Sequence, residues 1–161
     1  MEGNELEEKI DQIRKVIHKL KEKHSKKKIK WLMDICDPEF GLVESLIANF
    51  IQNVDQTKYA TKILRLLRKL LEYVPEVIYD QLVKCESLPE ALAKYIKITS
   101  LDNMTPDAFL LLTEFFKESE YGEILADEEF GDKLFEVLLI INKAEYFDAV
   151  CNIILVRFKS M

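Results

Sequence analysis

The side chains that most often carry catalysis, histidine and cysteine, are few and widely spaced in this chain. The two histidines, His18 and His24, lie in a lysine-rich N-terminal segment, whereas Cys36, Cys85 and Cys151 lie far apart among apolar residues. An odd, scattered set of cysteines without a C-x-x-C pair is typical of neither a disulfide framework nor a zinc site. We therefore expect reduced and mostly buried thiols. A Cys36–His24 nucleophilic pair is the catalytic alternative, and a buried cysteine beside a solvated histidine is the simpler interpretation.

Familiar catalytic and ligand-binding motifs are missing from the sequence. It contains no P-loop, no G-x-G-x-x-G, no H-E-x-x-H and no EF-hand pattern. The acidic run Asp127-Glu128-Glu129 resembles a cation site only superficially, because acids at a helix start also complement the positive end of the helix dipole. We therefore expect a protein that is not an enzyme and uses no cofactor or metal. An enzyme with a site built from cysteines and acids is the alternative from another class.

Charge is distributed unevenly along the 161 residues, whose formal net charge is −6. Residues 14–30 carry nine Lys or Arg and one acid, whereas residues 101–150 carry thirteen acids and three Lys. Such polarity can steer association or orient the chain on a partner. Two solvated helix faces are the simpler alternative.

The lysine run at residues 26–30 allows three interpretations: a nuclear localisation signal, a phosphate-binding patch or a solvated helix end, the last being the simplest. The acidic balance of the whole chain makes nucleic acid an unlikely ligand. No apolar run approaches the roughly 18 residues of a membrane span, and the acidic N-terminus lacks the apolar core of a secretory signal. We expect a cytoplasmic location, with a nuclear one as the alternative.

The elements that must position these residues are helices. Only 4 Gly and 4 Pro are available for turns, and apolar residues recur every three or four positions rather than alternately. We predict an all-α chain with helices near residues 5–24, 29–36, 39–52, 56–73, 75–85, 88–98, 105–118, 120–126, 129–142 and 144–159. Asp37, Asp55 and Thr105 are the expected N-cap residues, with Pro38 and Pro106 in first turns.

The first and last helices carry unusual apolar faces. In the first, the apolar residues follow steps of four and three, which is a heptad seam of about two and a half heptads: Leu6, Ile10, Ile13, Ile17 and Leu20. Because it is too short for an independent coiled coil, we expect this helix to pack on the end of the domain. The last helix is apolar on more than one face and should be covered by further repeats, by another chain or by the N-terminal helix.

The chain also shows a weak internal repeat. Residues 39–41 and 129–131 share the sequence Glu-Phe-Gly, and Ser-Leu-Pro at 87–89 occupies the equivalent place between them. Each opens a medium apolar helix that is followed by a polar break and a longer helix. We predict a leading basic helix at residues 1–28, followed by a repeat domain at 29–161 with units near 29–73, 75–118 and 119–159.

Residues 75–92 resemble the first two helices of an armadillo repeat. Pro75 leads a short helix and Leu88-Pro89 opens the second, although Glu86-Ser87 stands where the family usually has a glycine. The resemblance extends in degenerate form over residues 29–159. It implies a short right-handed α-solenoid whose third helices line a concave groove, with paired HEAT-like helices as the alternative.

A basic stripe on one predicted third helix is the most specific surface feature. Lys58, Lys62, Arg65 and Lys69 follow at steps of four, three and four, with Arg68 beside them. Like charges at this spacing repel by a few tenths of a kcal/mol per pair, so a stripe of them is a local cost. The resemblance places it in the groove, facing an acidic or phosphorylated segment. Ordinary solvent-facing cations are the simpler alternative.

Later third helices would add Glu114 and the lone Asn152 to the same groove. The Trp and Asn ladder of importin-type armadillo proteins is missing, so nuclear-import cargo binding is not implied. We predict a protein-interaction module or scaffold that docks an acidic or phosphorylated partner segment along this groove. A self-associating structural subunit that uses the heptad seam and the apolar C-terminal helix is the alternative, with homo-oligomers as its product.

Overall fold

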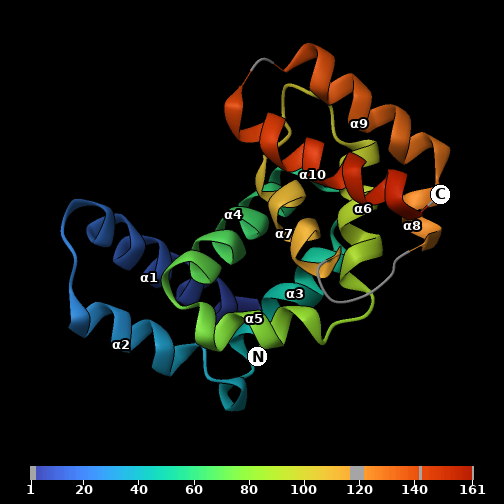
Figure 1. Ribbon diagram of the computed structural model, residues 1–161. Helices are drawn as coiled ribbons and strands as arrows, with labels where there is room; N and C mark the ends of the chain where they lie inside the picture. Colours follow the sequence, from blue (N-terminus) through green and yellow to red (C-terminus); the bar gives the residue numbers. More distant parts are fainter. Residues whose placement is uncertain (1–2, 117–121, 142, 161) are drawn as a thin grey trace.

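The computed structural model describes residues 3–116, 122–141 and 143–160, and every regular element in that part of the chain is helical (Figure 1). In chain order the elements are α1 (Gly3–Glu22), α2 (Lys26–Ile35), the short 3-10 turn η1 (Pro38–Phe40), α3 (Leu42–Gln52), α4 (Thr57–Tyr73), α5 (Pro75–Val83), α6 (Leu88–Ile98), α7 (Asp107–Phe116), α8 (Gly122–Ala126), α9 (Glu128–Ile140) and α10 (Ala144–Ser160). None of these described helices is long and apolar enough to cross a lipid bilayer.

Each predicted helix has a counterpart. The ends that fall in the described residues differ from the prediction by three residues or fewer, while the predicted ends at 118, 120 and 142 lie outside them. One predicted helix, at 39–52, is divided because Gly41 adopts a left-handed φ of 69° between η1 and α3. A residue with a Cβ rarely takes this conformation, so glycine suits the break.

The predicted N-cap is correct at Asp37 and wrong at Asp55, while Thr105 lies two residues before the start of α7 and bonds to its first residue. The Asp37 carboxylate accepts from the Glu39 backbone N–H at 2.9 Å, and the Thr105 hydroxyl accepts from the Asp107 N–H at 3.4 Å. Asp55 does not cap α4, whose N-cap is Gln56 without a side-chain hydrogen bond. Instead Asp55 pairs with Lys94 of α6 at 3.4 Å, because the loop before α4 passes that helix.

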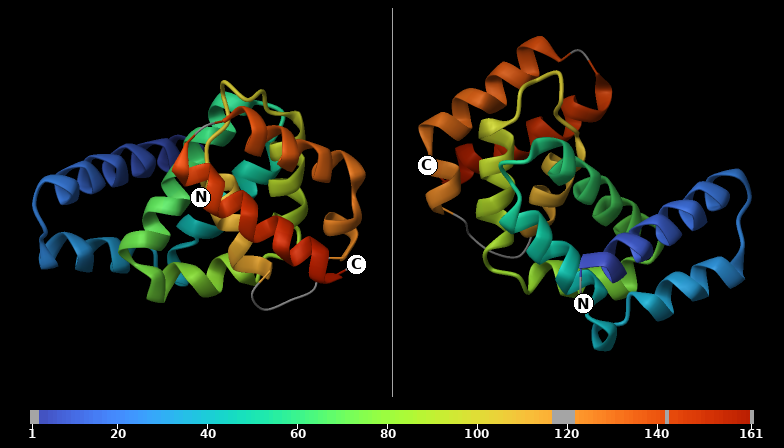
Figure 2. Two further views of the ribbon diagram at one scale, coloured as in Figure 1. Left: turned by 45° about the horizontal axis from the view of Figure 1, so that its top comes forward. Right: turned by 180° about the vertical axis from the view of Figure 1, so that it is seen from behind.

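The N-terminal helices form a hairpin that stands out from the rest of the chain (Figures 1 and 2). The Ser25 hydroxyl caps α2, so the lysine run at 26–30 forms its first half rather than the tail of α1. All five seam residues of α1 are buried, because α1 packs against α2, α3 and α4. The seam is therefore occupied within one chain, as expected for a helix at the end of a domain.

The remaining helices pack in two series. One series runs from α3 to α6 to α9, and the other from α4 to α7 to α10, with α3 also against α4 and α6 against α7. Aromatic pairs link neighbours: the Phe50 and Tyr95 ring centroids lie 6.1 Å apart, and those of Phe109 and Tyr146 6.0 Å apart. This arrangement places the starts of α7 and α10 beside α4.

The last helix, α10, is only partly covered. Tyr146, Ala149, Val150 and Ile153 are buried, whereas Phe147 remains 56% exposed. The N-terminal helix does not fold over this face, because α1 packs at the other end of the chain against α2, α3 and α4. Of the three covers that the sequence suggested for the exposed face of α10, further repeats and another chain are left.

Candidate binding groove

A groove of about 1120 Å³ lies between α1, α4 and a wall made by residues 104–107 and the start of α10. Nine of its lining residues are Lys or Arg and three are acids, a formal balance of +6 in a chain whose net charge is −6. The cations are Arg14, Lys15, Lys19, Lys21, Lys58, Lys62, Arg65, Lys69 and Lys143. A concave surface of one sign concentrates the field of its charges, so this groove is suited to an anionic ligand.

Helix α4 presents its basic stripe to the groove because its opposite face is buried in the core. Ala60, Ile63, Leu67 and Leu70 are fully buried, and this leaves the positions between them to face the groove. The four stripe cations at 58, 62, 65 and 69 all line it. Their mutual repulsion opposes helix stability by a few tenths of a kcal/mol per pair, and an anion between them would relieve it.

Helix α1 supplies the second set of cations. With Ile10 and Ile13 buried on one side of the helix, Arg14, Lys15, His18, Lys19 and Lys21 line the groove on the other, and the buried Ile17 reaches it between them. No acid occurs on α1 between Asp11 and Glu22. Two basic features whose nearest members, Lys21 and Lys58, are 37 residues apart in the sequence therefore form one surface.

One ion pair fastens α1 to α4 at the edge of the groove. The Glu7 carboxylate lies 3.5 Å from the Lys62 Nζ and accepts a hydrogen bond from the Tyr59 hydroxyl at 3.4 Å. Partial burial and, secondarily, the charge of Glu7 raise the pKa of Tyr59, so its proton stays in this hydrogen bond at neutral pH. The buried seam of α1 sets how the two basic helices pack, and this contact adds a weak link at the edge of the groove.

Most groove cations have no such partner. Lys69 pairs with Glu72 at 3.3 Å, whereas Arg14, Lys15, Lys58 and Arg65 make no ion pair with any described residue. Exposed pairs contribute only about 0–1 kcal/mol, so even the paired lysine can exchange its partner for a ligand.

The wall opposite α1 carries two acids and one lysine, and it is tightly hydrogen-bonded. The Tyr146 hydroxyl donates to the Met104 carbonyl at 2.5 Å, and the Thr105 hydroxyl donates to the Asp107 carboxylate at 2.5 Å. Burial raises the pKa of Tyr146 to about 12, which keeps this donor protonated. Asp107 and Glu145 line this wall together with Lys143, so both signs of charge meet at the far edge of the groove, whereas α1 and α4 contribute mainly cations.

A buried polar contact lies beneath the cations. The Thr61 and Tyr95 hydroxyls are 2.6 Å apart, and Thr61 also donates to the Thr57 carbonyl at 2.7 Å. Burial raises the pKa of Tyr95, against the opposing effects of the Thr61 hydrogen bond and the nearby Arg65 charge. One hydrogen bond between α4 and α6 thus holds the floor of the groove, and the tyrosine that takes part in it stays protonated at neutral pH.

The structure distributes the seven predicted site residues over two groups. Lys58, Lys62, Arg65 and Lys69 line the groove together. Arg68, Glu114 and Asn152 are not among its lining residues: Arg68 pairs with Glu72 at 3.7 Å, and the other two lie farther along α7 and α10. The residues that the prediction missed are those of α1, for which the basic segment at 14–30 was the available signal.

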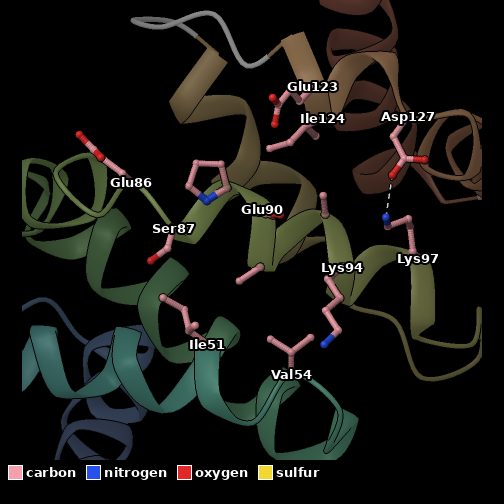
Figure 3. A pocket seen from close by; sticks show the side chains of 13 residues that line it. Ile51, Val54, Glu86, Ser87, Glu90, Lys94, Lys97, Glu123, Ile124 and Asp127 are labelled. Carbon is pink, nitrogen blue, oxygen red and sulfur yellow. Dashed lines mark hydrogen bonds and ion pairs between the residues drawn. The ribbon is translucent and has the colours of Figure 1, made fainter.

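A second hollow, of about 800 Å³, lies between α3, α6 and α8 (Figure 3). It is lined by both signs of charge, and its best-defined polar contact, Lys97 Nζ to the Asp127 carboxylate at 2.6 Å, is already satisfied within the chain. Its chemistry is less selective than that of the basic groove.

The cysteines and histidines do not assemble into a site. Cys36 is buried, and burial raises the pKa of its thiol to about 12. His24 precedes α2 and Cys36 follows it, so the helix holds them roughly 15 Å apart. The structure therefore does not bring together the Cys36–His24 pair that the sequence left as an alternative. Among the described residues, no group of three or more His, Cys, Asp or Glu is placed to hold a metal ion.

No protein-family model, curated protein or solved structure matches this chain.

Proposed function

We propose that this chain is a non-enzymatic interaction module that binds an acidic or phosphorylated segment of a partner protein in the groove between α1 and α4. The observation that carries the proposal is the convergence of nine cations on one concave surface of an acidic chain. Several of these cations lack any ion-pair partner among the described residues. Charge complementarity of this kind speeds association and fixes the register of the partner.

The apolar residues of the groove form its floor. Ile17, Leu66, Met104 and Tyr146 line it beneath and between the cations, and their side chains are only 4–6% exposed. Because the chain itself covers this floor, the charged rim carries the recognition, and a segment rich in acids or phosphates fits best. Asp107 and Glu145 on the far wall favour a basic residue at one end of that segment.

We further propose that the helices form three armadillo-like units of a right-handed α-solenoid. The support is the packing of α3, α6 and α9 in one series and of α4, α7 and α10 in another, in the order that stacked units require. In this arrangement the starts of the third helices form the far wall of the groove, and α1 closes it at the front.

Binding of an array of acidic and phosphoserine peptides, read by fluorescence anisotropy, tests the function. We expect Lys58→Glu/Arg65→Glu to weaken binding roughly tenfold to hundredfold, because both side chains line the groove and neither has an ion pair to lose. Lys84→Glu/Lys159→Glu changes the net charge equally outside the groove and should bind like the wild type.

An equal loss of peptide affinity in both double variants would show that only net charge matters and would contradict binding in the groove. Tighter binding of a single-stranded oligonucleotide than of any peptide would replace the protein partner by a nucleic acid. Circular dichroism of each variant verifies that the helices remain folded.

A further inference from the structure

Helix α2 is a basic helix with an unpartnered outer face. It packs chiefly against α1, and Leu32 is its one buried residue. Lys26, Lys30 and Met33 follow at steps of four and three, so they share one side of the helix, and all three are exposed. Phe40, in the turn η1 just beyond α2, is 65% exposed. This surface combines cations with two apolar side chains that stay partly exposed, and the exposed acids Asp34, Asp37 and Glu39 lie at its edge.

The outer face of α9 has the opposite charge and the same apolar character. Glu128, Asp132 and Glu136 are exposed along it. Between them Phe135 is 45% exposed and Leu139 is 83% exposed. The buried residues Phe130, Leu134 and Val137 occupy the other side of the helix, so Phe135 and Leu139 lie on its outward side together with the acids.

The two surfaces lie at opposite ends of the molecule. In all three views α2 belongs to the projecting hairpin and α9 to the far end (Figures 1 and 2). One chain therefore cannot bring its own α2 onto its own α9. A symmetric contact between two α9 faces would oppose their acids, and one between two α2 faces would oppose their lysines, and like charges at an interface are strongly unfavourable.

We propose that copies of this chain associate head to tail, with the α2 face of one copy on the α9 face of the next. Lys26 and Lys30 meet Asp132 and Glu136 across the contact, while Met33 and Phe40 pack against Phe135 and Leu139. Such an interface is heterologous, so each added copy presents another free end and the assembly extends or closes into a ring. The association goes beyond partner binding, because neither face lines the basic groove.

Charge-swap variants test this contact. Variant A carries Lys26→Glu/Lys30→Glu, and variant B carries Asp132→Lys/Glu136→Lys. For the wild type, sedimentation velocity should show a mass that rises with concentration. This mass should fall when salt rises from about 0.1 M to about 1 M, which shortens the Debye length from about 10 Å to about 3 Å.

Variants A and B should each associate at least about tenfold more weakly than the wild type, because each opposes like charges in its own contact. An equimolar mixture of A and B should regain wild-type association, since each α2 face then meets a complementary α9 face. Both variants should still bind the groove peptide like the wild type, so failure here is distinguishable from failure of the proposed function.

A wild type that stays monomeric at the highest attainable concentration in low salt would overturn the proposal. So would self-association of A or B at wild-type strength, or a mixture that associates no better than its components. Lys84→Glu/Lys159→Glu is the control for net charge and should associate as the wild type does.

Discussion

The apolar face of α1 and that of α9 have similar residue types but different environments. The seam of α1 is covered by α2, α3 and α4, whereas Phe135 and Leu139 of α9 face outward. Acids interrupt the α9 face, while the α1 seam is free of charge along its length. Helical periodicity thus identifies an apolar face, but the neighbouring helices decide whether the chain covers it.

The two regions also differ in how they use charge. On α1 and α4, cations converge on a concave surface, where their fields add. On α9 the acids lie along a convex outer face with apolar side chains between them. The first arrangement suits a ligand that enters a groove, and the second suits a helix that lies against the surface.

The largest difference between the N-terminal region around α1 and α2 and the C-terminal region of α9 and α10 should appear in the reactivity of their thiols. Cys36, between α2 and η1, is fully buried and has a pKa near 12, whereas Cys151 on α10 is half-buried. Because the thiolate is the nucleophile and a thiolate of higher pKa is intrinsically more reactive, Cys36 at pH 8 should react with Ellman's reagent roughly a hundredfold more slowly than a free cysteine.

Stopped-flow absorbance of Cys85→Ser, which leaves Cys36 and Cys151, measures the two rates. Cys85→Ser/Cys151→Ser isolates the slow phase, and denaturant should abolish the difference. A fast Cys36 in the folded protein would mean that the N-terminal region opens readily, which would contradict the comparison.

Truncation of one apolar residue in each region should affect stability unequally. Ile13→Ala removes a fully buried side chain from the α1 seam and should cost about 2–5 kcal/mol in the free energy of unfolding. Leu139→Ala removes a side chain that is 83% exposed and should change that free energy by about 0.5 kcal/mol or less. Urea denaturation at a concentration where the chain is monomeric measures both. Similar losses of stability would show that the monomeric chain itself covers Leu139 in solution, and this would contradict the comparison.

Periodicity predicted the helices well because the stabilising contacts are local or repeat every turn. The seam of α1, the Asp37 cap and the stripe of α4 are all determined within one helix or its ends. Asp55 was assigned wrongly because its partner, Lys94, is distant in sequence, and neither residue shows this in its local context.

Only the α4 side of the groove could be predicted, because the α1 side depends on contacts between residues that are distant in sequence. The contribution of α1 depends on the packing of its seam onto α4 and on the Glu7–Lys62 pair, which sequence spacing does not reveal. Arg68 precedes Lys69 by one residue and is therefore turned by about 100° from the stripe. Glu114 and Asn152 lie about two turns beyond the starts of α7 and α10, and only those starts reach the groove.

The smallest effect concerns Asp127, which anchors α9 to α6. Its carboxylate caps α9 through the Glu129 and Phe130 N–H groups and pairs with Lys97 at 2.6 Å. Asp127→Ala loses both roles and should cost about 1 kcal/mol, whereas Asp127→Asn keeps the cap and should cost less. If α9 and α10 open separately from the rest of the chain, amide hydrogen exchange in Asp127→Ala should be faster in α9 and unchanged in α1.

The pH dependence of the free energy of unfolding of the same variants tests the Lys97–Asp127 ion pair. The hydrogen bond from Lys97 is the main cause that lowers the pKa of Asp127. A carboxyl whose pKa is lower in the folded chain stabilises it above the ordinary aspartate value of about 3.9 and loses this contribution as pH falls through the folded value. Asp127→Asn should therefore be less stable than the wild type at neutral pH and approach it in acid. A difference that stays constant across this range would assign the loss to packing and leave the α6–α9 contact independent of charge.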